Sequence, residues 1–545
     1  MASPFPRVER WLALASLLVV AVVGAPPAFA QFWSGDFSIS EGDVNDTFTS
    51  LNNQRFMAVD DSNNLYITFF DNRNKVGLDD NFEIYFRRFV YNFGSPQNEI
   101  KRVTNAHNPS RYPSIANLNW GVTDAGTRAD SGRIYLAWQD SRLFSIPTAG
   151  APKSSTIFFR TFMSRGGTGF GPEIQVSPYD SLNQAVAPVL AVGDSNRVWI
   201  VWPKLLAGNS DQDLEYAIYN RLTREMGPTQ PLVAIPTSTA NNPTIATTRE
   251  GVVHVVWEDN RAGAKLQLFT KRFTPGTGWS ADQQIVFVPG SGVARNPSLI
   301  ATRSGRLHLV WRDTRDGNAE VYYKEFTPGV GWDAADTRLT VQASTQIEAQ
   351  VDADPMDNVY VAWTDLRNGA SNPDIYYLER KNGTWGTELA LVSAASDTTN
   401  SVQHFPGLTH DGTGLSYLAW TDERMPASGG SNKEAFYKQG FGNVTAAPVA
   451  GTSPLTRLLR NYPNPFNPRT TIDFSLDRDA QTNIRVYDVQ GRMVRQLVDS
   501  YLAAGRRSVT WDGKDDTGAP VASGVYFLRL EAGGHFSTRS VNLLK

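Results

Sequence analysis

The sequence predicts an all-β protein in which a seven-bladed β-propeller is followed by a small Ig-like β-sandwich. One aromatic-centred strand pattern recurs seven times along the chain, which is the main sign of a repeat architecture. The copies are spaced as blades of four short strands require. The pattern stops near residue 440, and a different set of alternating strands and turns fills the last 85 residues or so.

The first 30 residues predict a cleaved signal peptide. Arg7 and Arg10 precede an apolar run over residues 11–24, and Ala28 and Ala30 form an A-x-A cleavage site. The apolar run is short for a membrane span. We therefore expect cleavage near Ala30, no transmembrane span in the mature chain, and a location outside the cell or on the outer-membrane surface of a Gram-negative-type bacterium.

Composition excludes several classes of function. The chain has 545 residues, so two or more domains are expected. The net charge of -3 offers no basic surface for nucleic acid. The absence of cysteine excludes disulfides, Cys-zinc sites and thiol catalysis. We expect a monomer without a resident cofactor.

The repeat occupies residues 31–440, with anchors 52 to 69 residues apart. The anchors are Phe69, Trp138, Trp202, Trp257, Trp311, Trp363 and Trp420. Aliphatic residues stand two positions before each anchor, rings three before, and small or β-branched residues one before. A strand with these two faces fits a blade between two neighbours. The seventh repeat lacks a fourth strand, and we expect residues 32–40 to supply it and close the ring.

Six repeats continue the anchor as an aromatic-x-D-x-R motif, which has a catalytic and a structural interpretation. The aspartates could be acids and the arginines could bind a carboxylate. A motif repeated around a ring is better explained as architecture, with Asp accepting turn amides and Arg pairing with it. The residues assigned to this structural repeat are Trp138, Asp140, Arg142, Trp257, Asp259, Arg261, Trp311, Asp313, Arg315, Trp363, Asp365, Arg367, Trp420, Asp422 and Arg424.

Departures from the repeat predict a recognition surface. The third repeat replaces Asp and Arg of the motif with Lys204 and Leu206, and long loops follow the motif in repeats one, two and seven. Such loops on one rim are where ligands are expected. The candidate binding residues are Asn74, Asp79, Asp80, Asn81, Leu143, Lys153, Lys204, Met425 and Lys433.

Histidines and acidic loops give weaker indications. His254 and His308 occupy the ring position of the repeat and are expected to be packed there. Calcium could bind the acidic loops at residues 313–318 or 512–516, although neither fits an EF-hand loop. We expect no other metal and assign no catalytic residue.

The last part of the chain, residues 461–545, follows a linker at 441–460 and resembles a known family. The motifs are N-P-F-N-P, Y-D-x-x-G, W-D-G, S-G-V-Y and the terminal VNLLK, carried by Asn464, Pro465, Phe466, Asn467, Pro468, Gly491, Trp511, Gly524 and Tyr526. Together they resemble the C-terminal sorting domain of the type IX secretion system and the related Ig-like domain of flagellar-hook-capping proteins. The resemblance implies the secretion machinery as a partner; a structural Ig-like domain is the alternative.

Three functions remain open at this point. The favoured one is a secreted or surface-displayed propeller that binds a glycan or protein. The propeller is similar, in its repeats alone, to sialidases, which makes a glycoside hydrolase or polysaccharide lyase the first alternative. No sialidase Asp-box, arginine triad or Tyr-Glu pair can be assigned in the sequence. A structural envelope or adhesion protein is the second alternative.

Overall fold

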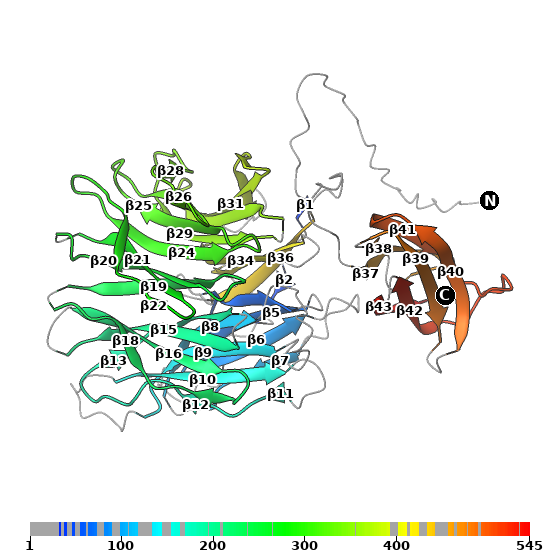
Figure 1. Ribbon diagram of the computed structural model, residues 1–545, viewed down its shortest axis with the longest axis horizontal. Coiled ribbons are helices and arrows are strands. Elements are labelled where there is room, and N and C mark those ends of the chain that lie inside the picture. Colours follow the sequence, from blue (N-terminus) through cyan, green and yellow to red (C-terminus); the bar gives the residue numbers. More distant parts are fainter. Residues whose placement is uncertain are drawn as a thin grey trace, which may run out of the picture.

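The computed structural model describes residues 32–544 except 34–36, 41–45, 50–54, 61–63, 74–80, 90–98, 107, 118–132, 144–153, 164–168, 194–195, 208–210, 237, 264, 355, 393–401, 411–414, 424–432, 442–455, 463–465, 477, 489–491 and 533–534. Every regular element in this part of the chain is a β-strand (Figure 1). None of these residues belongs to a helix with the length and hydropathy of a membrane span.

Seven antiparallel sheets form the propeller, coloured blue to yellow in Figure 1. The strand nearest the axis comes first in each blade. In two of the seven blades this strand is broken into two pieces. These innermost strands are β3 (Thr47–Phe48) with β4 (Met57–Val59), β8 (Ser110–Asn117), β13 (Gln184–Ala185) with β14 (Val189–Gly193), β19 (Ala240–Thr247), β24 (Ala294–Ala301), β29 (Gln346–Ala353) and β34 (Gln403–His410). Each contacts the next, and β34 contacts β4, so the ring is closed.

The anchor of each repeat lies on the second strand. The second strands are β5 (Leu65–Asp71), β9 (Arg133–Asp140), β15 (Arg197–Leu205), β20 (Val253–Asp259), β25 (Leu307–Asp313), β30 (Val359–Asp365) and β35 (Ser416–Asp422). The third strands are β6 (Glu83–Phe89), β10 (Thr156–Met163), β16 (Gln212–Asn220), β21 (Gln267–Thr274), β26 (Glu320–Thr327), β31 (Asp374–Lys381) and β36 (Glu434–Phe441).

The outer strand of a blade is usually broken into two short pieces. These are β7 (Glu99–Arg102), β11 (Gly169–Phe170), β12 (Ile174–Gln175), β17 (Glu225–Met226), β18 (Gln230–Val233), β22 (Gly278–Trp279), β23 (Gln283–Val286), β27 (Gly331–Trp332), β28 (Thr337–Arg338), β32 (Thr384–Trp385) and β33 (Leu389–Val392). The break follows a Gly-aromatic turn, where Gly278 has φ +91° and Gly331 φ +113°, values that glycine adopts without strain.

The seventh blade takes its outer strand from the beginning of the chain. β1 (Phe32–Trp33) and β2 (Phe37–Ser38) both pair with β36, with Phe32 opposite Phe441 and Phe37 opposite Tyr437. The Ile39 amide extends this pairing by donating to the Ala435 carbonyl at 2.7 Å. The seven-bladed propeller predicted from the sequence is therefore confirmed, including the strand that closes it.

The hydrophobic core of the propeller lies between blades. Each of the seven clusters of buried residues in the described part of the propeller spans one seam between neighbours. Trp138 of β9 packs with Tyr66 and Phe70 of the preceding blade. The anchor face of each sheet therefore meets the ring face of the sheet before it. This is the two-faced strand that the alternation predicted.

Lysine side chains also cross several seams. Lys271 Nζ lies 2.9 Å from the Leu232 carbonyl of the preceding blade, and Lys324 Nζ lies 2.8 Å from the Ile285 carbonyl. These hydrogen bonds reach the outer strand, far from the innermost contacts. Neighbouring blades are thus joined at both ends of the seam.

The repeated motif holds the strands of one blade together. Asp259 is fully buried and accepts from Trp257 Nε1 at 2.9 Å, from the Arg261 amide at 2.8 Å and from Arg261 Nη2 at 2.5 Å. The same three contacts recur at Asp140, Asp313 and Asp365. Asp422 accepts from Trp420 Nε1 at 2.9 Å, whereas Arg424 lies outside the described residues.

An acidic residue on the outer strand completes this arrangement. Arg261 Nη1 lies 2.6 Å from Asp282 Oδ2, and Arg367 Nη2 lies 2.8 Å from Glu388 Oε2. The Arg367 guanidinium also stacks 3.8 Å from the centre of the Tyr376 ring on β31. The motif thus links the second, third and outer strands, a geometry that favours the structural interpretation.

The C-terminal strands form a separate sandwich, orange to red in Figure 1. One sheet contains β37 (Arg457–Tyr462), β38 (Thr470–Leu476) and β41 (Gly505–Trp511); the other contains β40 (Met493–Leu502), β39 (Ala480–Tyr487), β42 (Gly524–Ala532) and β43 (His535–Leu543). Phe466, Trp511 and Tyr526 pack in its core. The Ig-like sandwich predicted from the sequence is confirmed, and β37 begins within the stretch predicted as linker.

Asp365 tests the structural interpretation through pH. Burial alone raises the pKa of Asp365, but hydrogen bonds from Arg367 and Trp363 outweigh it and leave the pKa below 3.8. A lowered folded-state pKa stabilises the protein above the unfolded pKa, and this contribution is lost as pH falls through the folded value. We expect Asp365→Asn to cost roughly 1.5–3 kcal/mol at pH 7 and much less near pH 3.

The measurement is thermal unfolding of both proteins between pH 7 and pH 3. Glu250→Gln, at an exposed carboxylate, is the matched control and should leave the melting temperature unchanged throughout. If the difference in melting temperature between Asp365→Asn and the parent protein stays constant with pH, the structural role assigned to the Asp365 carboxylate is contradicted.

Candidate functional site

Four of the rim residues predicted to bind a ligand lie in the described part of the structure. Asn81 Nδ2 donates to the Ala106 carbonyl at 3.0 Å, Lys204 pairs with Glu215 at 3.0 Å, and Lys433 pairs with Glu423 at 2.9 Å. Leu143 is partly exposed. Asn74, Asp79, Asp80, Lys153 and Met425 lie outside the described residues, as do Asn464, Pro465 and Gly491 of the C-terminal motifs.

One position inside the repeated motif varies from blade to blade and was not among the predicted site residues. Between anchor and aspartate, the seven blades carry Phe70, Gln139, Pro203, Glu258, Arg312, Thr364 and Thr421. The flanking residues are nearly constant, so this variation was visible in the sequence. The position faces the next blade, close to where the innermost strand of that blade begins.

In several blades this position accepts a backbone amide across the seam. The Thr49 amide donates to Thr421 Oγ1 at 3.0 Å, the Ala187 amide to Gln139 Oε1 at 3.2 Å, and the Asn296 amide to Glu258 Oε1 at 2.6 Å. Ala187 and Asn296 have positive φ angles of 44° and 53°, at a bulge in the innermost strand. The cross-seam hydrogen bond helps to stabilise this strained backbone.

Arg312 breaks this arrangement in the fifth blade. A guanidinium cannot accept a hydrogen bond, so it cannot satisfy the equivalent amide of the sixth blade. Arg312 Nε and Asn241 Oδ1 are both buried without a hydrogen-bond partner among the described residues. Arg295 lies directly opposite Arg312 on the neighbouring strand. Like charges opposite each other destabilise a sheet, so this pair is not explained by stability.

Glu258 is the only carboxylate described in contact with these cations. It is fully buried, lies opposite Asn241, and approaches Arg295 Nε at 3.4 Å. Asn242 Nδ2 donates to Glu258 Oε1 at 2.7 Å. Burial raises the pKa of Glu258 despite these hydrogen bonds. Burial and then the charge of Arg295 lower the pKa of Arg312.

Six residues lie where the innermost strands of the fourth and fifth blades begin and their second strands end. We call them the mouth cluster: Asn241, Asn242, Glu258, Arg295, Asn296 and Arg312. The seam between the sixth and seventh blades adds Glu348, which accepts from the Phe405 amide at 2.8 Å and approaches His404 Nδ1 at 3.3 Å. Arg295, Glu348 and His404 are partly exposed, so solvent reaches this end of the ring.

The channel below the mouth cluster is nearly filled by side chains. Its cavity of about 20 Å³ is lined by residues that include Ser114, Thr244, Ser298 and Gln350, and holds about one water molecule. Phe56 fills space beside Gly407, where any larger residue would collide with its ring. Side chains therefore fill most of the space at the centre of the ring.

The other candidate sites from the sequence occupy ordinary structural positions. Burial lowers the pKa of both His254 and His308 to about 4, as expected for packed rings. Asp515 Oδ1 accepts the Thr517 and Ala519 amides of its own turn. Within the described ranges, no group of three or more His, Asp or Glu side chains is placed to hold a metal ion.

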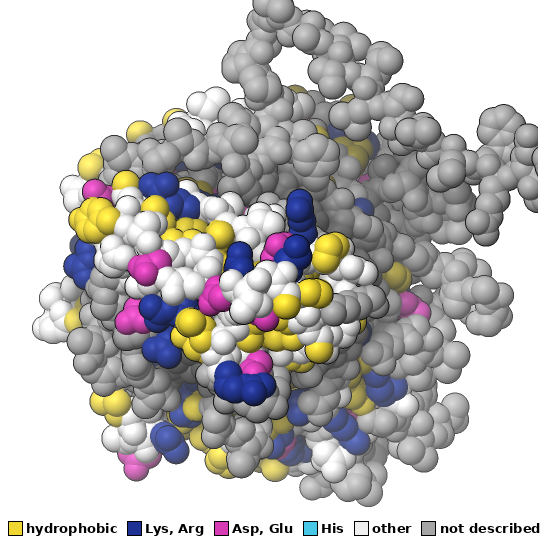
Figure 2. Space-filling model, turned by 90° about the vertical axis from the view of Figure 1, so that its right-hand side faces the viewer, with side chains coloured by type: hydrophobic (Ala, Val, Ile, Leu, Met, Phe, Trp, Pro, Cys, Tyr) yellow, Lys and Arg dark blue, Asp and Glu magenta, His cyan; other side chains and the backbone are white. Residues whose placement is uncertain are grey.

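The surface carries mixed charge. On the side shown in Figure 2, basic, acidic and hydrophobic side chains are interspersed without an extended block of one sign. This distribution agrees with the net charge of -3.

Three solved structures illustrate what the chain is similar to. A polysaccharide lyase described as Uly1 is 12% identical with a TM-score of 0.47, covering 72% of this chain and 90% of that one. A GH93 α-L-arabinofuranosidase of Fusarium graminearum, in complex with arabinobiose, is 14% identical with a TM-score of 0.40, covering 64% and 98%. A protein of unknown function from Dyadobacter fermentans DSM 18053 is 10% identical with a TM-score of 0.44, covering 77% and 100%.

Sequence comparisons concern the C-terminal part. None of the curated proteins matches the chain. Residues 467–535 match the family model described as the FlgD Ig-like domain, so the Ig-like resemblance predicted from the motifs is confirmed.

Proposed function

We propose that this protein is an exported propeller that binds an anionic glycan at the mouth cluster. The observation that carries the proposal is Arg312, which stands where several other blades place an acceptor and lies directly opposite Arg295. Arginine binds carboxylate or sulfate groups through paired hydrogen bonds. Asn241 and Asn242 add amide groups of the kind that bind sugar hydroxyls.

The charge balance of the site favours an anion. Arg295 and Arg312 face each other, and Glu258 offsets only one of them. An incoming carboxylate or sulfate would relieve the repulsion between the guanidiniums. A partly exposed Arg295 gives the ligand access, while the half-buried Arg312 provides a less hydrated, stronger contact.

Arg312→Gln separates binding from folding. We expect at least tenfold weaker binding of an anionic glycan, because a charge-assisted hydrogen bond contributes about 1.5–3 kcal/mol. The melting temperature should stay the same or rise, since the change removes a like-charge pair and glutamine can accept an amide, as Gln139 does. The measurement is calorimetric titration with ligands from an array of uronate-containing, sulfated and neutral glycans.

Arg249→Gln is the matched control, since Arg249 is exposed and follows the far end of β19. It should bind like the parent protein. The proposal is wrong if neutral glycans bind as tightly as anionic ones, or if Arg312→Gln binds normally.

The alternative is that the same site cleaves its glycan. Glu258 favours it, because a buried carboxyl with a raised pKa can act as a general acid. Glu258→Gln retains an acceptor for the Asn296 amide and should abolish hydrolysis or lyase activity while leaving the fold intact. The measurement is chromatography of polysaccharides after incubation with the parent protein or with Glu258→Gln. If the parent protein leaves the polysaccharides intact, binding is the function of the site and cleavage is not.

The compartment forms the second half of the proposal. The signal-like residues 1–30 and the C-terminal module support export by the type IX secretion system, with the module as the sorting domain. In a bacterium with that system, deleting residues 457–545 should abolish surface delivery while cleavage near Ala30 continues. Cell fractionation and N-terminal sequencing measure the two steps. Unchanged surface delivery of the shortened protein would make the module a structural domain.

A further inference from the structure

A pocket in the C-terminal sandwich lies beside its core, of which Leu543 is a part. It has a volume of about 220 Å³ and is lined by Pro468, Arg469, Asp512, Gly513, Lys514, Pro520 and Leu543. Three of the motifs singled out in the sequence meet here: N-P-F-N-P supplies Pro468, W-D-G supplies Asp512 and Gly513, and the terminal VNLLK supplies Leu543.

Backbone hydrogen bonds fix these three segments around the pocket. The Phe466 amide donates to the Asn542 carbonyl at 2.9 Å, and the Leu544 amide returns to the Phe466 carbonyl at 2.9 Å. Trp511 Nε1 donates to the Lys514 carbonyl at 2.9 Å. The aromatic residues of the motifs are therefore explained by the core, which leaves the pocket residues to be explained separately.

Gly513 keeps the pocket open. Its φ of +70° favours glycine, and a Cβ atom would lie 3.0 Å from the Pro468 carbonyl oxygen and 3.4 Å from Leu543 Cδ1. A larger residue would thus be strained and would press on two walls. Glycine at position 513 therefore leaves the space between Pro468 and Leu543 unfilled.

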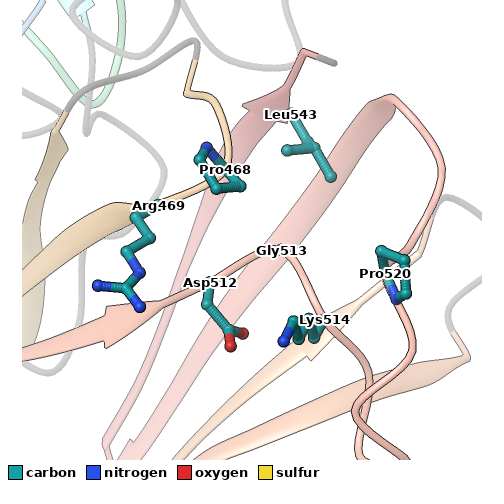
Figure 3. A pocket seen from close by; sticks show the side chains of 7 residues that line it. All are labelled: Pro468, Arg469, Asp512, Gly513, Lys514, Pro520 and Leu543. Carbon is teal, nitrogen blue, oxygen red and sulfur yellow. The ribbon is translucent and has the colours of Figure 1, made fainter.

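Three charged groups around the pocket have no partner in the described structure. Arg469, Asp512 and Lys514 form no ion pair or side-chain hydrogen bond there, and Arg469 and Lys514 are exposed. Figure 3 shows their charged ends on one side of the pocket and Leu543 on the other. Two cations and one carboxylate leave a net positive charge beside an apolar wall.

We propose that this pocket binds the C-terminal residue of a peptide chain. The terminal carboxylate lies between Arg469 and Lys514, a charge pairing that a neutral group cannot make. An aliphatic side chain packs on Leu543 and Pro520, for which the volume of the pocket is sufficient. The amide N–H of the same residue donates to Asp512, which explains a carboxylate among cations.

N-acetyl-L-leucine is the probe, because it carries the carboxylate, the aliphatic side chain and the amide N–H. N-acetyl-L-leucinamide lacks only the charge. With the full mature chain we expect saturation-transfer NMR to give millimolar binding of the acid and at least fivefold weaker binding of the amide. Arg469→Gln and Lys514→Gln should each weaken binding of the acid severalfold without changing the melting temperature.

Two variants separate this site from others. Arg507→Gln, at a partly exposed arginine of the sandwich outside the pocket, should bind the acid normally. Arg312→Gln should also bind it normally, so loss of binding there would place the probe at the mouth cluster and overturn the pocket. Equal binding of acid and amide, or unchanged binding in both pocket variants, would overturn it as well.

Discussion

A propeller sheet is buried on both faces, and the rest of this structure depends on that constraint. Each second strand must present a large anchor to one neighbour and a ring with a small residue to the other, as Trp138 and Tyr66 do at one seam. Burying a large side chain contributes about 1.5–3 kcal/mol, and each blade gains it only when both neighbours are present. The ring therefore has to close, which is why the first and last strands of the propeller pair.

The same constraint limits where a site can form. Residues that join the strands of a blade, such as Asp259 and Arg261, are already committed to hydrogen bonds and to ring stacking. The position between anchor and aspartate has more freedom, because it reaches the bulged innermost strand of the next blade. Where it is an acceptor it stabilises the seam, and where it is Arg312 the seam loses that bond.

Much of the fold could be predicted because repetition makes the two-faced strand visible in the sequence. The anchors, the alternation and the missing fourth strand of the last repeat together predicted seven blades and their closure. The acidic residues Asp282, Asp336 and Glu388 were missed, although each follows the aromatic residue of a Gly-aromatic or equivalent turn by three or four positions. They pair with the motif arginines only after the outer strand has folded back.

The candidate site was harder to predict because no short segment contains it. Arg295 and Arg312 belong to adjacent strands, and Glu258 comes from the preceding blade. The long loops and the repeated charges are the conspicuous features of the sequence. The informative position is the one between the anchor and the aspartate, which does not repeat. Comparing equivalent positions around the ring would have identified it. The pocket of the sandwich was similarly divided among three motifs that are distant in the sequence.

The pairing of Phe32 with Phe441 also has a consequence for the rate of folding. These partners are about 400 residues apart, so closing the ring has a high contact order and must wait for nearly the whole propeller to be made. Until then β36 has a free edge, and the blades on either side of the gap expose one face. A chain that emerges from a membrane channel with its amino end first would reach its final state only after residue 441 has followed. Completion of the propeller is thus delayed by topology alone, because the strands that close it lie at its two ends.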